Sequence, residues 1–96
     1  MISKTIHRRL TVISQELDAL RDEGAILAEQ LAFAHDVVEE SRLRALVAET
    51  PLAERDLRIA GEDLRRIARV MADVERQAAR LRQEQDRLLA QATELS

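Results

Sequence analysis

The sequence predicts an all-α protein folded as a long antiparallel helical hairpin, and three observations lead to this prediction. The strong helix formers Ala, Leu, Glu and Arg dominate a chain of 96 residues, 34% of which are charged. Residues that form turns are scarce, since the chain holds two glycines and one proline. Two long heptad patterns of apolar residues lie on either side of that proline. Sheets and globules with many turns need more turn residues than this chain has.

The first heptad pattern predicts a helix over about residues 3–48. Its apolar or small residues recur at alternating spacings of four and three: Ile6, Leu10, Ile13, Leu17, Leu20, Gly24, Leu27, Leu31, Ala34 and Val38. A run of more than four heptads is typical of a coiled-coil seam. Leu43, Leu46 and Val47 fall outside this pattern, so residues 41–49 form either the end of this helix or a short helix of their own.

The second heptad pattern predicts a helix over about residues 51–95. Its members are Leu57, Ala60, Leu64, Ile67, Met71, Val74, Ala78, Leu81, Gln85, Leu88, Ala92 and Leu95. Proline disfavours the helical conformation for the residue before it, and Thr is a good N-cap for a helix whose first residue is Pro51. We therefore expect a break at residues 49–51 and a single helical-hairpin domain over residues 1–96.

The position of the break favours an antiparallel register in which facing residue numbers sum to 98. Five layers then pair a small residue with a large one, such as Val38 with Ala60 and Leu20 with Ala78. A register shifted by one heptad gives a similar number of small-large layers, so only the position of the break distinguishes the two registers. Charge favours the same pairing, because residues 16–40 carry eight acidic side chains and one Arg, whereas residues 65–82 carry six Arg and two acidic side chains.

A second apolar stripe on the first helix predicts self-association. Val12, Ala19, Ile26 and Phe33 repeat every seven residues away from the seam, and they are the proposed interface. The second helix has its own apolar residues outside the seam: Ile59, Ala68, Val70, Ala72, Ala79 and Leu89. Exposed apolar patches mark interaction surfaces, so two hairpins are expected to pair into a four-helix homodimer. The alternative is that these residues are scattered apolar side chains on a solvent face.

Composition argues against several classes of partner and location. A net charge of -3 and a pI near 5.4 argue against nucleic acid, because neutralising phosphates requires a basic excess. No run of 18 apolar residues is present, and the N-terminal segment MISKTIHRRL lacks the apolar core of a signal peptide, so no membrane association is expected. The absence of Cys fits a reducing compartment, and a cytoplasmic location is the default expectation.

No constellation of residues predicts catalysis, a cofactor or a metal. His7 and His35 are separated by about 42 Å along one helix, so a single site cannot use both within one chain. His35 and Glu39 form an i, i+4 pair that could hold a metal at an interface, although a solvated pair on the flank of a helix is the expected role. Gln85, the one polar side chain at a core position of the second seam, either fixes the register or is solvated near a fraying end.

The stretch RLRALVAETPLAERDL, at the expected break, resembles small uncharacterised helical-hairpin proteins of GC-rich, actinobacterial-type bacteria. That resemblance implies a helical fold and no known activity. In size and helix plan the chain also resembles the all-helical chorismate mutases, which hold a dicarboxylate substrate with Arg and Lys. In outline it is similar to the coiled-coil domains that enter the secondary channel of RNA polymerase by an acidic tip. The leading expectation is a non-enzymatic interaction protein that forms a homodimer and presents a helix face or its tip to an unidentified protein partner.

Overall fold

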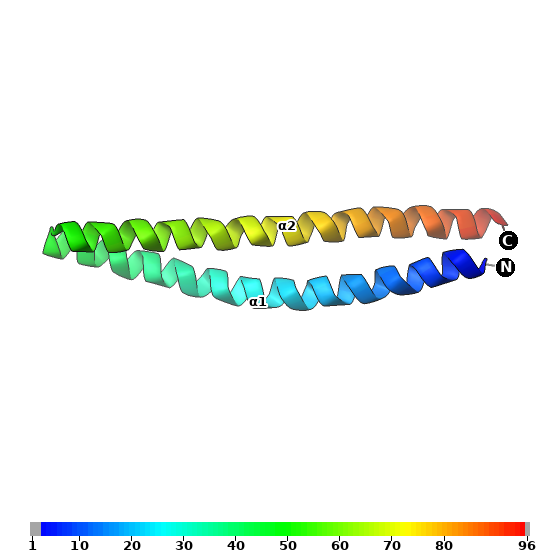
Figure 1. The fold of residues 1–96 in the computed structure, drawn as a ribbon, viewed down its shortest axis with the longest axis horizontal. Helices are drawn as coiled ribbons and strands as arrows, with labels where there is room; N and C mark the ends of the chain where they lie inside the picture. The colour runs from blue at the N-terminus through cyan, green and yellow to red at the C-terminus, as the bar shows by residue number, and fades with distance from the viewer. Residues whose placement is uncertain (1–2, 96) are drawn as a thin grey trace. The chain divides into compact units, whose positions relative to one another are not determined.

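The fold is an all-α helical hairpin, as the sequence predicts. A computed structural model describes residues 3–95 of the chain, with side chains as far as residue 94. It contains the helices α1 (Lys4–Ala48) and α2 (Pro51–Leu95), which pack against each other (Figure 1). Residues 3–95 include no strand, and neither helix has an apolar stretch long enough to cross a membrane.

The N-terminus of α1 is capped by Ser3. Its side-chain Oγ accepts a hydrogen bond from the backbone N–H of Ile6 at 3.1 Å, and its carbonyl oxygen accepts one from the N–H of His7 at 2.9 Å. These bonds satisfy donors that have no partner within a helix, which is why Ser is favoured at this position. The helix therefore begins at Lys4, next to the expected start at residue 3.

The turn between the helices consists of Glu49 and Thr50. Glu49 has a φ of 51°, in the left-handed region, and its N–H donates to the carbonyl oxygen of Ala45 at 3.1 Å, which closes the end of α1. Thr50 is the N-cap of α2, because its Oγ1 accepts the N–H of Ala53 at 3.2 Å and its carbonyl oxygen accepts the N–H of Glu54 at 3.1 Å. Pro51 occupies the first helical position, where no N–H is needed.

Residues 41–48 continue α1, so the alternative of a separate short helix is not adopted. The reason lies at two positions that extend the first seam by spacings of three and four, Ser41 and Ala45. Both side chains are buried. Their small size allows the helices to approach each other closely next to the turn, while Leu43, Leu46 and Val47 point away from the core and are exposed.

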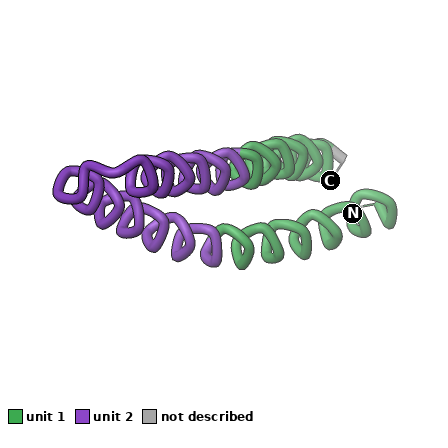
Figure 2. Tube along the Cα trace, turned by 60° about the vertical axis from the view of Figure 1, so that its left-hand side comes forward, with its two compact units in different colours: residues 1–24, 73–96 green, residues 25–72 purple. Residues whose placement is uncertain are grey.

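The hairpin comprises two compact units, one of residues 1–24 with 73–96 and one of residues 25–72, which includes the turn (Figure 2). Each unit has its own buried side chains along the two seams. In the first they are Ile13, Leu20, Val74, Ala78, Leu81 and Ala92; in the second they are Leu27, Ala34, Val38, Ser41, Ala45, Ala53 and Ala60. The assignment of residues 1–96 to a single domain stays a prediction.

Every predicted seam residue whose side chain the structure describes is buried or half-buried. The side chain of Leu95 lies outside the described part of the chain. In the unit of residues 25–72, the buried pairs Val38 with Ala60 and Ala45 with Ala53 each sum to 98, which fits the favoured register. The first of these pairs sets a large residue against a small one, whereas the second, next to the turn, consists of two alanines.

Candidate functional site

The four residues of the predicted interface stripe all lie on α1 with exposed side chains. Val12 and Ala19 belong to the unit of residues 1–24 and 73–96, and Ile26 and Phe33 to the unit of residues 25–72. Ile26 is 57% exposed and Phe33 is 70% exposed. Phe normally contributes to a core or an interface, so an exposed Phe makes its surroundings a candidate site.

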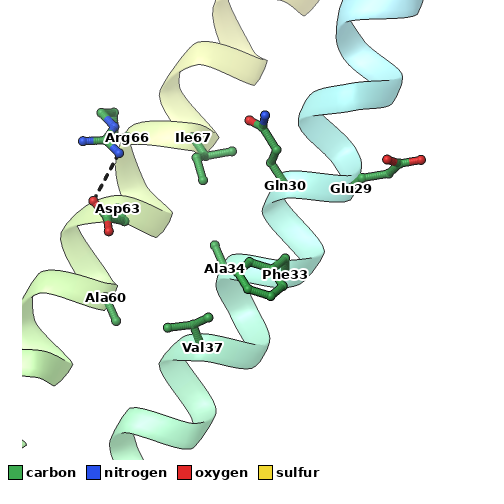
Figure 3. A pocket seen from close by; sticks show the side chains of 9 residues that line it. All are labelled: Glu29, Gln30, Phe33, Ala34, Val37, Ala60, Asp63, Arg66 and Ile67. Carbon is green, nitrogen blue, oxygen red and sulfur yellow. Dashed lines mark ion pairs between the residues drawn. The ribbon is translucent and has the colours of Figure 1, made fainter.

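Phe33 stands at the wall of an apolar groove of about 470 Å³ in the unit of residues 25–72 (Figure 3). We call it the Phe33 groove. Its lining comes from both helices: Glu29, Gln30, Phe33, Ala34, Val37, Ala60, Asp63, Arg66 and Ile67.

Small side chains create this groove. Ala34 and Ala60 are buried seam residues that fill little of the space between α1 and α2. Val37 and Ile67 point toward the facing helix from either side, whereas Glu29 points away from it (Figure 3). Arg66 pairs with Asp63 at 3.2 Å at the edge of the groove. The buried side chains of the lining, Ala34 and Ala60, are both apolar.

The position of the groove shows which apolar residues of α2 lie on the same side of the helix pair as Phe33. Residues seven apart on a helix lie on nearly the same face. Ile59 is seven residues before Arg66, and Val70 is seven residues after Asp63, so both flank the groove. Their side chains are 41% and 40% exposed. The sequence gives these residues as apolar and outside the seam, but the side on which they lie comes from the structure.

A second groove, which we call the arginine groove, lies in the same unit and shares no lining residue with the first. It measures about 400 Å³ and is lined by Val38, Arg42, Leu57, Arg58, Gly61, Leu64 and Arg65. Arg42 pairs with Glu39 at 2.6 Å. Arg58 and Arg65 form no ion pair with any residue of the described chain, so two arginines of the groove lack a carboxylate partner.

A cluster of exposed aliphatic residues, the apolar tip, surrounds the turn. Its members are Leu43, Leu46, Val47 and Leu52, with exposed fractions between 63% and 85%. The heptad pattern already places the first three outside the seam. Their position beside the turn makes the tip a third candidate surface for contact with another molecule.

The described residues form no cluster of metal-binding side chains. His7 and His35 are both exposed on α1, and no group of three or more His, Cys, Asp or Glu suited to a metal is found among residues 3–94. Gln85 is half-buried.

Ion pairs lie mostly within single helices rather than between the charged blocks of α1 and α2. Arg21 pairs with Asp18, Arg42 with Glu39, Arg66 with Asp63 and Arg76 with Asp73, each three residues apart. In the described chain only Arg9 and Glu84 join the two helices. Exposed pairs of this kind contribute little to stability, so packing along the seams holds the hairpin together.

Comparison with known protein families, with curated proteins and with solved structures finds no match. Function is therefore inferred from the chemistry of the two grooves and of the apolar tip.

Proposed function

We propose that this chain is a non-enzymatic protein-protein interaction protein, a structural coiled coil that self-associates as a homodimer in the bacterial cytoplasm. The single observation that carries the proposal is Phe33, which is 70% exposed at the wall of an apolar groove. A hairpin with a complete core does not need an aromatic side chain in solvent. Burying Phe33 in an interface would remove a large apolar surface from water.

Self-association fits this surface because the exposed Phe33 side chain and the Phe33 groove lie on the same face. In a two-fold dimer each surface patch meets a copy of itself, so Phe33 of each chain can enter the groove of the other. Ile26 and Val70, both exposed, extend the apolar area beyond the groove. Four helices then surround a shared core, which is the four-helix arrangement that the second stripe of α1 predicts.

The lining of the arginine groove favours binding over catalysis. It holds arginines and aliphatic residues but no carboxylate or histidine that could act as a general acid or base. The alternative of a helical enzyme similar to the chorismate mutases requires a carboxylate beside the arginines of a pocket between helices. No residue that lines the arginine groove meets that requirement, and in the Phe33 groove the one arginine, Arg66, is paired with Asp63 at the edge.

Sedimentation equilibrium of the purified chain tests the homodimer. We expect a dimer at tens of micromolar for the natural sequence, and a monomer for the double variant Ile26→Glu with Phe33→Glu. The matched control is Ala25→Glu with Ala32→Glu, which adds the same charge at the same spacing to exposed positions of the same helix. The control should remain a dimer.

Two results would contradict the proposal. A natural chain that sediments as a monomer at these concentrations rules out the homodimer. If both double variants dissociate equally, added negative charge on α1 is responsible and the stripe is not the interface. Circular dichroism of each variant reports whether the helices are retained.

The apolar tip supports a second candidate, a coiled-coil regulator that contacts a larger assembly through its turn. Four large aliphatic side chains in solvent at one end of a helix pair resemble a docking surface more than a part of the core. The test is affinity capture from native cytosol with the natural chain and with Leu46→Ser plus Val47→Ser. A partner retained by the first and lost with the second supports this role, and equal capture contradicts it.

A further inference from the structure

The arginine groove carries an inference that does not depend on self-association, because its lining is separate from the Phe33 groove. We infer that it is a docking site for an acidic amphipathic helix of another protein. Three features of the groove lead to this inference: its charge, its apolar floor and a glycine that opens it.

Charge selects an acidic partner. Arg42, Arg58 and Arg65 line the groove from both helices, and only Arg42 has a carboxylate partner, Glu39. A guanidinium group binds carboxylates in a planar fork and remains charged at all physiological pH values. Two arginines without a partner beside one groove therefore attract a ligand that supplies carboxylates.

The floor selects an amphipathic partner rather than a simple anion. Val38 is buried, and Leu57 and Leu64 are half-buried, so the bottom of the groove is aliphatic. A free carboxylate or phosphate would leave that apolar surface in water. A ligand with aliphatic side chains between its carboxylates can contact both the arginines and the aliphatic floor. Amphipathic helices commonly bind in grooves of this kind, with their apolar face in the groove.

The spacing of the arginines matches a helix. Arg58 and Arg65 are seven residues apart on α2, which corresponds to about 10 Å along the axis. Carboxylates at positions i and i+7 of a docked helix repeat at the same distance. Apolar residues between them, at positions i+3 and i+4, would then lie level with Gly61, between Leu57 and Leu64.

Gly61 has no role in the backbone and does have one in the groove. It lies inside α2 and is not among the residues with a positive φ, so Ala would form the helix better at this position. A Cβ atom at residue 61 would lie 3.4 Å from Nη1 of Arg65, the closest atom it would meet. That distance is an ordinary van der Waals contact, so Arg65 does not require the glycine. The missing Cβ instead leaves the surface between Leu57 and Leu64 open to a ligand, at a cost in helix stability.

The test measures binding of a fluorescein-labelled synthetic helix made of Glu, Leu and Ala, with Glu at i and i+7 and Leu at i+3 and i+4. Anisotropy is recorded with the full chain at constant ionic strength. We expect Arg58→Gln with Arg65→Gln to weaken binding roughly tenfold. The matched control, Arg55→Gln with Arg69→Gln, removes the same charge from α2 outside the groove and should change the affinity less than about twofold.

The glycines provide a second, independent readout. Gly61→Ala should raise the midpoint of thermal unfolding and weaken binding of the peptide. Gly24→Ala should raise the midpoint similarly and leave binding unchanged, because a Cβ there meets nothing within 4 Å and Gly24 is not in the groove. A loss of affinity in Gly61→Ala alone supports the docking site.

Several outcomes would overturn the inference. If the two double arginine variants lose the same amount of affinity for the peptide, positive charge anywhere on α2 attracts it. Equal binding of a peptide with Lys in place of Glu would remove charge as the cause. Displacement of the peptide by millimolar inorganic phosphate would indicate a simple anion site. Displacement by an excess of the Arg58→Gln with Arg65→Gln chain, which lacks the groove arginines, would indicate that a second copy is the occupant.

Discussion

Arg9 of α1 and Glu84 of α2 form a bidentate ion pair, with 2.5 Å between Nε and Oε2 and 2.8 Å between Nη2 and Oε1. Both side chains are partly exposed, at 39% and 30%. The pair joins the two helices within the unit of residues 1–24 and 73–96. Paired hydrogen bonds of this kind fix the relative position of two side chains more closely than a single contact does.

This ion pair predicts a dependence of stability on pH. The hydrogen bond from Arg9 holds the pKa of Glu84 below its ordinary value, against an opposing effect of desolvation. Because the folded state then binds fewer protons than the unfolded state, the stabilisation is complete above the unfolded pKa and is lost as the pH falls through the folded pKa. We expect Glu84→Gln to lower the unfolding midpoint at neutral pH and to match the natural chain well below about pH 4.

Thermal unfolding over a range of pH checks this expectation, with Glu39→Gln as the control. Glu39 pairs with Arg42 three residues along the same exposed helix face, so its loss should have a smaller effect at neutral pH. A midpoint difference for Glu84→Gln that is the same at neutral and acid pH would contradict the prediction.

Much of the fold could be predicted because the seams are regular. Ile13 and Leu27 are buried at heptad positions, as the spacing predicts, and Thr50 caps α2 before Pro51. Such features depend on local rules of periodicity and capping that a single sequence displays. The end of α1 does not follow from the apolar pattern, because the seam continues there through Ser41, a polar residue that such a pattern does not include.

The sites were harder to predict because they depend on how side chains from two helices meet. The Arg9–Glu84 pair lies outside the charged blocks that favour the hairpin, and long side chains choose partners by local geometry. Similarly, Gly61 and Arg65 are four residues apart in a charged helix, and nothing in that spacing distinguishes a groove from an ordinary surface. The signal that could have found the arginine groove is the glycine itself, in the interior of a helix rich in Ala.

The conformation of Glu49 predicts that glycine would be better at this position. Its φ of 51° costs a residue with a Cβ roughly 1 to 2 kcal/mol, and glycine would relieve this strain. Part of the gain is lost because glycine also makes the unfolded chain more flexible. We expect Glu49→Gly to stabilise the hairpin by about 0.5 to 1 kcal/mol in urea unfolding. Glu49→Ala, which retains the strain, should leave stability nearly unchanged, and an equal gain in both variants would contradict the explanation.

Thr50 is expected to contribute through its hydroxyl. Replacing it with Ala removes the acceptor for the Ala53 N–H at the start of α2, and the loss of an N-cap costs about 1 kcal/mol. Thr50→Ser keeps the oxygen and is the matched control, so it should retain nearly the full stability. The midpoint of urea unfolding measures both variants; a Ser variant as unstable as the Ala variant would show that the methyl group, and not the cap, matters.

Ile13 and Ile26 provide a comparison of the same residue type in two roles on α1. Ile13 is 0% exposed and is the largest fully buried side chain in the described chain, so Ile13→Ala should destabilise the hairpin by about 2 to 5 kcal/mol. Ile26 is 57% exposed, and Ile26→Ala should cost less than about 0.5 kcal/mol when unfolding is measured in dilute solution.

At higher protein concentration the two variants should diverge further, because Ile26 lies in the proposed interface and Ile13 does not. The natural chain should gain stability with concentration through dimerisation, and Ile26→Ala should gain less. Ile13→Ala should keep the concentration dependence and lose stability at every concentration. If Ile26→Ala gains as much as the natural chain does, the exposed stripe of α1 contributes nothing to assembly and Ile26 is an ordinary surface residue.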